Sequence, residues 1–345
     1  MSKILLTGGS GQLGRCLLDR MPADWQVLAP RHDELDIAHA QAVQAYVSAH
    51  APHIIINAAA FNAVDLAERN PVQAHAVNAL GPANLATAAT QAQARLVHIS
   101  TDYVFDGKAS HPYIEPDAPF PINQYGLSKM LGEQNVLSTL PDSIVIRTSW
   151  LYSEYGHNFV RTILKLVLDS TNADTGASRQ NKPDMHAAAQ LAPLRVVDDQ
   201  TGCPTYAGDL AEAIITLASR QSAGQNPNTS SVDTKTPHAN EPDTNRIYHY
   251  CGANAMTWYA FAQQILACAK ALNESLIMPE LHAIKTLDYA APAARPAMSV
   301  LSCKKIEAMG IVSRPLERSL AKVVKQWLDQ SSKMIASRNP LPDAR

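Results

Sequence analysis

The sequence predicts an α/β protein with a doubly wound parallel sheet and a smaller C-terminal domain. Three observations support this prediction. Short apolar runs alternate with helical patterns as far as residue 150, a glycine-rich turn joins the first run to the first helix, and the alternation becomes irregular after residue 168. Strands that alternate with helices are expected to lie parallel, because each parallel pair needs a crossover connection and a helix supplies it.

Five apolar runs have the length and composition of strands that are buried on both faces. They are KILLT, QVLA, HIIINAAA, RLVHIS and SIVIRTSW, at 3–7, 26–29, 53–60, 95–100 and 143–150. Between them, apolar residues recur at helical spacing over 13–21, 40–50, 71–93 and 125–137. Ligands of such sheets bind beyond the carboxyl ends of the strands, so we expect the functional residues there.

The later part of the chain divides less regularly. Residues 1–168 are expected to form the first domain, to which 205–220 and 246–252 return, and 193–331 form most of the second. The stretches 169–192 and 221–245 are polar and contain few large apolar side chains, so we expect surface insertions there. Residues 332–345 are expected to be a tail.

The composition is that of a globular protein and argues against several kinds of partner. Apolar residues make up 46% of the 345 residues, and the formal net charge is −2, so neither nucleic acid nor a membrane surface is expected as a partner. Cysteines at 16, 203, 251, 268 and 303 form no CxxC pair, which is typical of a reducing compartment. The chain opens with MSKILLTGG, without a charged leader. We expect a cytoplasmic protein, either a monomer or a homodimer.

The glycine-rich turn predicts a dinucleotide site. In ILLTGGSGQLG, Gly8, Gly11 and Gly14 lie between the first strand and a helix that begins near Gln12 and Leu13. Glycines here allow a tight turn and close approach to a pyrophosphate, which the free N–H groups at the helix N-terminus bind. A strand–helix turn without a ligand is the alternative. The position between a clear strand and a clear helix favours a Rossmann-like site.

The end of the second strand predicts the choice of cofactor. A carboxylate about twenty residues after the glycines binds the ribose hydroxyls of NAD, whereas an arginine accommodates the 2′-phosphate of NADP. LAPRHDELD has Arg31 at this turn and no acid before Asp33. We therefore expect NADPH, with NADH tolerated, although Arg31 is also compatible with an ordinary solvated side chain. Asp36 and Ile37 are expected to line the adenine.

Tyr125 and Lys129 stand four residues apart on the predicted helix 125–137, so both project from one face. The ordinary pKa of tyrosine is about 10, and we expect the Lys129 ammonium to lower the pKa of Tyr125. Such pairs are common on amphipathic helices and indicate little alone. Thr101, just after the strand 95–100, makes the combination specific, because its hydroxyl can hydrogen-bond a carbonyl oxygen that Tyr125 protonates.

The glycine turn, STDYVFDG, Tyr125 and Lys129 together resemble the extended short-chain dehydrogenase/reductase superfamily. Within it the chain is similar to the dTDP-4-dehydrorhamnose reductase family. The stretches that carry this similarity are GQLG, INAAAFNAVDLAE, VNALGPANLA, STDYVFDG, INQYGLSKMLGE, IRTSWLY, NFVRTIL, LRVVDDQTGCPTYAGDLAEAI and APAARPAMSVL. They follow the family order over about residues 1–330, interrupted by the two polar stretches.

The resemblance implies an oxidoreductase that reduces the C4 keto group of dTDP-4-dehydro-L-rhamnose to dTDP-L-rhamnose. Its first domain would bind NADPH and its second the sugar nucleotide. Thr101, Tyr125 and Lys129 would be catalytic, with Tyr125 as the proton donor. Further implied cofactor residues are Asn57, Ala58, Ala59, Ser100, Tyr125 and Lys129. The implied substrate residues are Val64, Asp65, Thr101, Asp102, Tyr103, Trp150, Asn158 and Arg295.

Two of these substrate residues have ordinary alternatives. Trp150 would pack on the sugar, but it is also compatible with a core aromatic. Arg295 would suit a diphosphate, since arginine donates two hydrogen bonds to phosphate oxygens, but it is also compatible with a solvated side chain. Some family members hold magnesium through an acid directly after the glycine turn. Arg15 stands there and cannot ligate a cation, so no magnesium site is predicted.

Other activities within and beyond the superfamily stay open. Dehydration of a sugar nucleotide is disfavoured, because the related dehydratases carry a second acid after the threonine–aspartate pair and Tyr103 stands there. A different sugar-nucleotide reductase or an epimerase is harder to exclude. A regulatory subunit similar to that of methionine adenosyltransferase, which binds NADP and acts on a partner protein, is the alternative that is not an enzyme.

Overall fold

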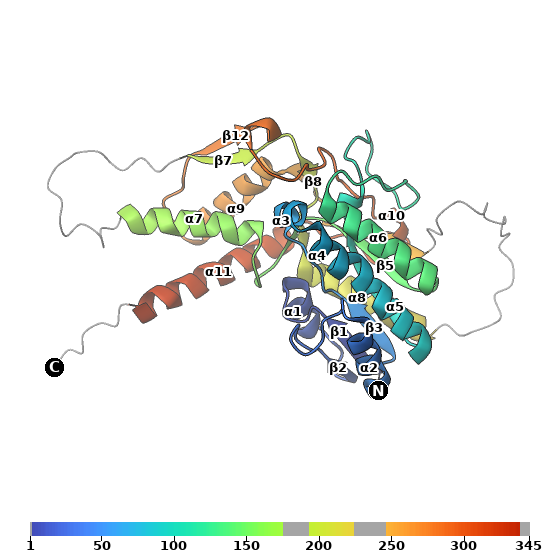
Figure 1. Cartoon of the computed structure of the whole chain (residues 1–345). Coiled ribbons are helices and arrows are strands. Elements are labelled where there is room, and N and C mark those ends of the chain that lie inside the picture. Colours follow the sequence, from blue (N-terminus) through green and yellow to red (C-terminus); the bar gives the residue numbers. More distant parts are fainter. Residues whose placement is uncertain (1, 175–192, 224–245, 339–345) are drawn as a thin grey trace, which may run out of the picture.

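A six-stranded parallel sheet forms the centre of the first domain in the computed structural model, which describes residues 2–174, 193–223 and 246–338 (Figure 1). The strands lie in the order β10-β5-β4-β3-β1-β2. Their bounds are β1 Ser2–Thr7, β2 Trp25–Leu28, β3 Ile54–Asn57, β4 Arg95–Thr101, β5 Ile144–Thr148 and β10 Ile247–His249. The chain order reverses between β1 and β3, which is where doubly wound sheets bind their ligands. The predicted fold class is confirmed.

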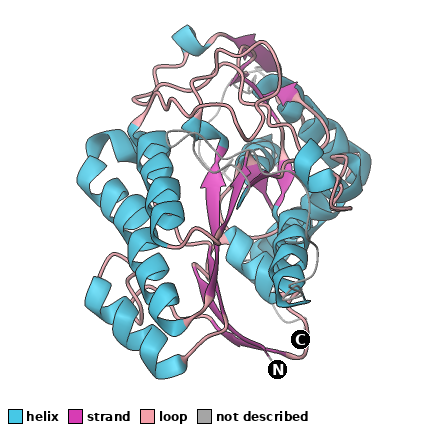
Figure 2. Cartoon of the chain, turned by 90° about the vertical axis from the view of Figure 1, so that its right-hand side faces the viewer, coloured by secondary structure: helices cyan, strands magenta, loops and turns pink. Residues whose placement is uncertain are grey.

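Helices cover both faces of this sheet (Figure 2). Helices α1 Gln12–Leu18 and α8 Ala207–Ala223 pack on one face, and α2 Ala40–His50, α5 Gly81–Ala92 and α6 Gln124–Thr139 on the other. Ile4 and Leu6 belong to the core beneath α1 and α8, whereas Leu5 belongs to the core beneath α2 and α5. Successive side chains of a strand point to opposite faces, so a sheet that is covered on both sides needs the continuous apolar runs seen in the sequence.

The predicted helix 71–93 contains a change of winding. It begins as α4 Pro71–His75, passes through a π-helical turn at Ala76–Leu80 and continues as α5. The buried Asn78 in this turn accepts a hydrogen bond from the Phe61 nitrogen at 2.8 Å, and its amide donates to the Phe61 carbonyl at 2.9 Å and to the Ser128 hydroxyl at 3.0 Å. The wider turn thus connects the loop after β3 to α6. Hydrophobic spacing alone does not reveal such a turn.

In the second domain three long helices pack together, and one of them covers a two-stranded parallel sheet (Figure 1). The helices are α7 Phe159–Asp174, α9 Trp258–Leu272, which covers the sheet, and α11 Glu317–Arg338, and the strands are β7 Leu194–Val197 and β12 Leu281–Ile284. The first of these helices, α7, includes residues up to 168 that we expected in the first domain. Helix α7 extends past residue 169, where we expected an insertion to begin, and α11 extends past 332, where we expected a tail. Most of both predicted insertions lies outside the described residues.

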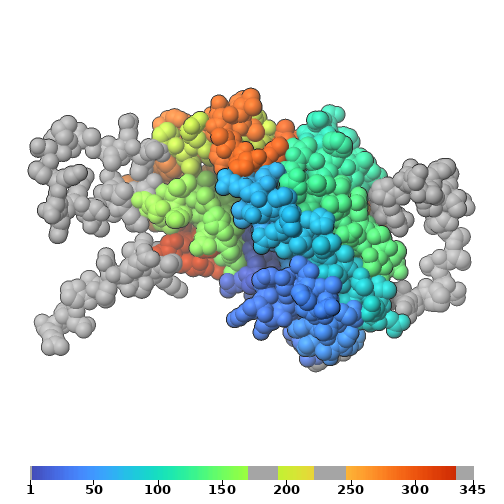
Figure 3. Space-filling model, viewed as in Figure 1, coloured from blue at the N-terminus to red at the C-terminus, as the bar shows by residue number. Residues whose placement is uncertain are grey.

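Shorter elements connect the two domains, which lie side by side in Figure 3. They are α3 Val64–Arg69, α10 Lys304–Glu307, β6 Leu151–Tyr152, β8 Thr201–Gly202, β9 Thr205–Tyr206, β11 Met256–Thr257 and the 3₁₀ turns Asp102–Val104 and Thr286–Asp288. Strand β6 pairs with β9, and β8 pairs with β11. Residues 205–220 and 246–252, which we expected to return to the first domain, supply most of α8 and the whole of β10. Within the described residues, no helix combines the length and the apolar character needed to cross a membrane.

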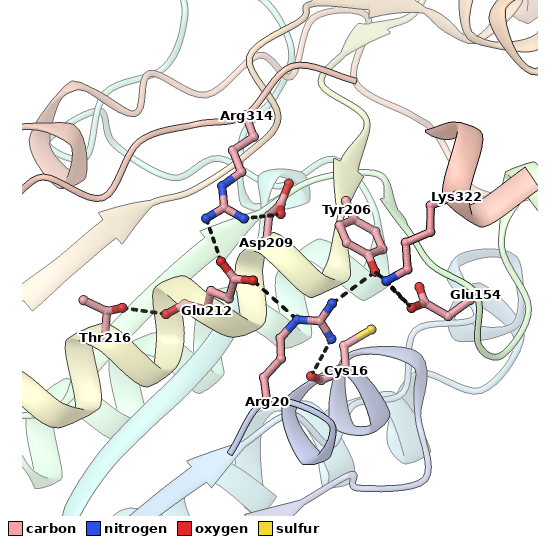
Figure 4. Close-up of polar contacts among 9 residues, drawn as sticks. All are labelled: Cys16, Arg20, Glu154, Tyr206, Asp209, Glu212, Thr216, Arg314 and Lys322. Atoms are coloured by element: carbon pink, nitrogen blue, oxygen red, sulfur yellow. Dashed lines mark hydrogen bonds and ion pairs between the residues drawn. The ribbon is translucent and has the colours of Figure 1, made fainter. Parts of the chain in front are cut away.

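A polar cluster ties the second domain to helix α1 (Figure 4). The Tyr206 hydroxyl lies at its centre: it donates to Glu154 at 3.0 Å and accepts from Arg20 and Lys322, each at 3.1 Å. Arg20 follows α1, and Lys322 belongs to α11. Ion pairs join the neighbouring members of the cluster, which are Arg314, Asp209 and Glu212. The C-terminal helix is therefore fixed against the helix that follows the glycine turn.

Candidate active site

A cavity of about 510 Å³ opens at the carboxyl ends of β1, β3, β4 and β5. Its walls come from the glycine turn, the loop after β3, the ends of β4 and β5, helix α6, and residues of the second domain. The predicted residues that line it are Gly11, Gln12, Leu13, Gly14, Ala58, Val64, Ser100, Thr101, Asp102, Tyr103, Tyr125, Lys129 and Trp150. The predicted residues that do not line it are Gly8, Arg31, Asp36, Ile37, Asn57, Ala59, Asp65, Asn158 and Arg295.

The glycine turn needs glycine for steric reasons at two positions. Gly8 has φ +74°, in the left-handed region, and a Cβ there would lie 2.5 Å from the backbone of Ala58. A Cβ on Gly14 would lie 2.2 Å from the Gly8 carbonyl oxygen. Helix α1 begins at Gln12, and within the described residues no side chain caps its N-terminus at Gly11. Its first N–H groups are therefore available to an anion, as a dinucleotide pyrophosphate requires.

Three buried polar atoms on the cavity wall lack hydrogen-bond partners among the described residues. They are Ser100 Oγ, Thr148 Oγ1 and Asp102 Oδ2. Buried polar groups in proteins are nearly always hydrogen-bonded, so the two unpaired hydroxyls, together with the glycine turn, fit a bound nicotinamide dinucleotide. The unpaired oxygen of Asp102 instead disfavours the charged form of its carboxyl group.

Helix α6 brings Tyr125 and Lys129 to the end of β4. Its first turn packs closely on the turn after β4, since a Cβ on Gly126 would lie 2.1 Å from the Tyr103 carbonyl oxygen. The Tyr125 ring meets the Tyr103 ring edge-on, with centroids 5.7 Å apart. Lys129 is only 2% exposed, and its Nζ donates to the Ile99 carbonyl at 2.5 Å. The structure thus brings the predicted catalytic pair beside Thr101.

The pKa of Tyr125 differs from the sequence-based expectation. Burial raises it to about 12, the nearby Asp102 charge also raises it, and the Thr101 hydroxyl lowers it. The charge of Lys129 does not offset this rise in the pKa of Tyr125, and the Lys129 ammonium donates to the Ile99 carbonyl. Burial lowers the pKa of Lys129 itself to about 8, opposed by the charge of Glu133. Tyr125 therefore keeps its proton at neutral pH, which is the form that a proton donor needs.

Glu133 lies one helical turn beyond Lys129 and is held by a buried arginine. Arg147 on β5 donates to Glu133 from Nε at 2.9 Å and from its terminal nitrogen at 2.7 Å. Both side chains are almost fully buried. Burying a charged pair is costly unless the geometry is good, and the paired hydrogen bonds of Arg147 supply that geometry. The pair fixes the end of β5 to the helix that carries Tyr125 and Lys129.

Several predicted cofactor residues lie behind the cavity wall. Asn57 is buried, accepts from the Thr7 hydroxyl at 2.7 Å and from the Ala59 nitrogen at 3.2 Å, and contacts His98 Nδ1 at 3.1 Å. These bonds shape the loop after β3 that carries Ala58. Ile37 packs against the helix that begins at Gly81. Such residues hold the cavity wall in place.

Arg31 lies at the surface after β2 and is engaged by two acids. Its guanidinium forms an ion pair with Asp33, and its backbone nitrogen donates to Glu34 at 2.7 Å. The side chain is 71% exposed. Asp36 uses its carboxylate to cap its own turn, accepting from the Ala38 nitrogen at 2.9 Å. The predicted arginine is therefore at the expected turn, but its charge is shared with a neighbouring acid.

Two stacked tryptophans form the second-domain side of the cavity. The Trp150 and Trp258 rings lie parallel, with centroids 3.5 Å apart, and both line the cavity. Trp150 has φ +45°, in the left-handed region, which non-glycine residues seldom adopt. Gly202 packs against the edge of its indole, where a Cβ would lie 2.4 Å away. The stack and the glycine together fix the Trp150 ring.

The remaining predicted substrate residues are engaged elsewhere. Arg295 forms an ion pair with Asp65 at 2.9 Å. Asn158 precedes α7, where its Oδ1 accepts from the Arg161 nitrogen at 3.1 Å and its amide donates to the Ser153 carbonyl at 2.9 Å. The adjacent His157 lines the cavity instead.

Sequence reasoning missed part of the wall. The missed lining residues are Ala60, Asn62, Ala63, Ile99, Thr148, Ser149, Leu151, His157 and Trp258. Trp258 begins the helical pattern TWYAFAQQ. The aromatic pair in this pattern is visible in the sequence, but the sequence does not show that it lies at the cavity. Among the described residues, no three His, Cys, Asp or Glu side chains are grouped as metal ligands.

Comparison with known proteins is consistent with this site. The model of the family described as RmlD substrate binding domain matches residues 2–189 and 182–328. A dTDP-4-dehydrorhamnose reductase from Aggregatibacter actinomycetemcomitans is 37% identical over 94% of this chain and 98% of its own length. The spore coat polysaccharide biosynthesis protein SpsK of Bacillus subtilis is 35% identical over 94% of this chain and 98% of its own length.

Two solved structures are also similar. A dTDP-4-dehydrorhamnose reductase from Clostridium acetobutylicum has a TM-score of 0.76 and 31% identity, covering 96% of this chain and 99% of that one. The enzyme of the same name from Bacillus anthracis, in complex with NADP, has a TM-score of 0.74 and 30% identity over 95% of this chain and 99% of that one. These findings confirm the resemblance drawn from the sequence.

Proposed function

The chain belongs to the RmlD substrate binding domain family, and on that premise we propose that it reduces the C4 keto group of dTDP-4-dehydro-L-rhamnose with NADPH. The observation that carries this proposal is one cavity in which the glycine turn lies at one end and Thr101, Tyr125 and Lys129 at the other. The proposed reaction is that of an NADP-dependent oxidoreductase.

The residues that would hold the cofactor come from the first domain. The N-terminus of α1 would bind the pyrophosphate, and the unpaired hydroxyls of Ser100 and Thr148 would bind polar groups nearer the nicotinamide. Lys129, 2% exposed at the base of the cavity, would face the nicotinamide half. When bound, NADPH supplies the hydride that reduces the C4 carbon.

Tyr125 is proposed to donate a proton to the C4 oxygen. The high pKa of its phenol, about 12, keeps it protonated at neutral pH, and its ring is held by Tyr103. Lys129 is positively charged below about pH 8, and its ammonium would hold the nicotinamide ribose beside Tyr125. The Thr101 hydroxyl would orient the same oxygen.

The stacked tryptophans are proposed to bind the sugar. Their flat apolar faces suit the C–H groups of a deoxysugar, and the fixed ring of Trp150 loses little freedom on binding. Arg295 would approach the diphosphate while paired to Asp65, and His157 would close the opposite rim. Because Arg31 is shared with Asp33 and not reserved for a 2′-phosphate, we propose that NADH is also accepted.

Magnesium is not part of the proposed reaction. The guanidinium of Arg15, directly after the glycine turn, lies 4.3 Å from the centre of the Tyr155 ring. A cytoplasmic location and a monomeric or dimeric state stay predictions from the sequence.

A coupled assay tests the proposed function. Purified protein is mixed with dTDP-4-dehydro-L-rhamnose and NADPH, the absorbance of NADPH is followed, and the sugar product is identified by NMR. We expect one NADPH to be consumed for each dTDP-L-rhamnose formed. A GDP-linked 4-keto sugar is the control substrate and should react much more slowly. Tight NADPH binding without turnover would favour the regulatory-subunit alternative and overturn the proposal.

A further inference from the structure

The hydrogen-bond partners of the Thr101 hydroxyl raise a question about its role. A threonine hydroxyl has one hydrogen and two lone pairs. Thr101 Oγ1 donates its hydrogen to Asp102 Oδ1 at 3.0 Å and accepts from the Tyr103 nitrogen at 3.2 Å. In this arrangement no hydroxyl hydrogen is left for a substrate carbonyl. Thr101 can act as a donor toward the substrate only if Asp102 releases that hydrogen.

The surroundings of Asp102 disfavour its charged form. The side chain is 2% exposed, and its Oδ2 has no hydrogen-bond partner within the part of the chain that the structure describes. The nearby hydroxyls of Ser299 and Thr101 lower the pKa of Asp102, but burial outweighs them. A buried carboxylate with an unpaired oxygen is costly, and burial raises the pKa of Asp102 to about 7.

We propose that Asp102 is a positioning residue whose protonation controls whether Thr101 donates toward the substrate carbonyl, an inference that rests on the reduction proposed above. When Asp102 is protonated, its O–H donates to Thr101 Oγ1. The second lone pair of Thr101 still accepts from the Tyr103 nitrogen, and the hydroxyl hydrogen points into the cavity. When Asp102 is ionised, the Thr101 hydroxyl again donates its hydrogen bond to Asp102 Oδ1. The proton on Asp102 is never transferred to the substrate.

The other titratable groups around Asp102 behave differently near neutral pH. Burial raises the pKa of Tyr103 and of Tyr125, so both stay neutral. Arg295 stays charged and is paired with Asp65. Lys129, with a pKa of about 8, is the second group that titrates in this range. A pH profile of the wild-type protein therefore contains two overlapping steps, and substitution is needed to separate them.

The variant Asp102→Asn removes the step that belongs to Asp102. In the wild-type protein we expect kcat to fall as pH rises through about 7, by up to about tenfold for each further pH unit. Asp102→Asn should lack this step and retain the later step of Lys129. Thr101→Val should also lack it, at a lower overall rate, because Asp102 then has no hydroxyl to control. Asp106→Asn is the matched control: Asp106 lies four residues away, and its pKa is held low by a hydrogen bond from the Lys108 nitrogen.

Infrared spectroscopy detects the proton on Asp102 directly, without the need for turnover. The difference spectrum of wild-type protein minus Asp102→Asn should contain the C=O stretch of a buried carboxylic acid, which disappears as pH rises through about 7. NADPH binding by both proteins shows that the variant is folded. An ionised carboxylate throughout, or an unchanged first step in an active Asp102→Asn, would overturn control by Asp102 and leave the proposed reduction intact. Wild-type protein without turnover at any pH would overturn the reduction itself.

Discussion

The two walls of the cavity hold their side chains in different ways. On the first-domain wall, backbone turns and strand ends determine the positions: glycines close the turn after β1, and Ser100 and Thr101 lie at the end of β4. On the second-domain wall, Trp150 and Trp258 come from distant parts of the chain and are fixed by contact with each other. The first wall is therefore determined by local sequence, and the second by tertiary packing.

This difference predicts that substitutions on the two walls have separate effects on ligand affinity. Changes on the first wall should affect cofactor affinity, and changes on the second should affect the affinity for the sugar. Tyr125 lies between them, at the start of α6, and should affect the chemical step without affecting either affinity.

The largest expected effect comes from Tyr125→Phe. The ring remains and its edge-on contact with Tyr103 is kept, but the proton donor is lost. We expect kcat to fall by about 10²–10⁴, with the Kd of NADPH unchanged, as measured by steady-state assay and by NADPH fluorescence. Tyr155→Phe is the control, since its hydroxyl binds Asp19 at the surface. If Tyr125→Phe weakened NADPH binding as strongly as turnover, the ring would belong to the cofactor wall.

The second effect in size comes from Trp258→Ala, which removes the partner of Trp150. We expect the KM for the sugar nucleotide to rise about fivefold, because an aromatic pair contributes about 1 kcal/mol beyond its buried area. Trp258→Phe should show a smaller rise, since it keeps a flat ring. The KM for NADPH should stay constant.

Tyr259→Phe serves as the control on the same helix, because Tyr259 is not on the cavity wall and its hydroxyl approaches the Leu281 carbonyl. A parallel rise in both KM values for Trp258→Ala would mean that the two walls move together.

The smallest effect is expected at Asp33. Asp33→Asn releases the guanidinium of Arg31, so that Arg31 is more available to a 2′-phosphate. We expect the preference for NADPH over NADH to rise by about threefold, since exposed ion pairs are weak and are screened by salt. The ratio of kcat/KM values for the two cofactors measures it. Asp24→Asn removes the same charge at the opposite end of β2, away from Arg31, and should leave the ratio unchanged. If Asp33→Asn also left the ratio of kcat/KM values unchanged, Arg31 would lie outside the cofactor site.

The sequence allowed the glycine turn and the trio Thr101, Tyr125 and Lys129 to be placed on the cavity wall because their signals are local. The glycine spacing, the strand before Thr101 and the four-residue interval between Tyr125 and Lys129 each lie within one strand–turn or one helix. The same reasoning predicted the parallel sheet, since apolar runs and helical patterns are also local. It did not reveal the π-helical turn at Ala76–Leu80, because a change of winding leaves the hydrophobic pattern nearly intact.

The second wall could not be predicted in the same way. Nothing near Trp258 in the sequence indicates that it stacks on Trp150. Asn158 was predicted and not His157, although the local conformation of the bend before α7 decides which of them lines the cavity. The pKa of Tyr125 also depends on tertiary structure, because burial in the folded protein raises it to about 12.

The left-handed backbone of Trp150 is a local strain that the packing of its own indole outweighs. An L-residue with a side chain loses roughly 1–2 kcal/mol in that conformation, and a glycine would adopt it freely, as Gly8 does at φ +74°. The cavity, however, uses the indole. Trp150→Gly would relieve that strain but would also remove an indole packed on Trp258, and deleting a packed tryptophan side chain costs about 3–5 kcal/mol. Screens for heat resistance and for turnover would therefore both reject the glycine.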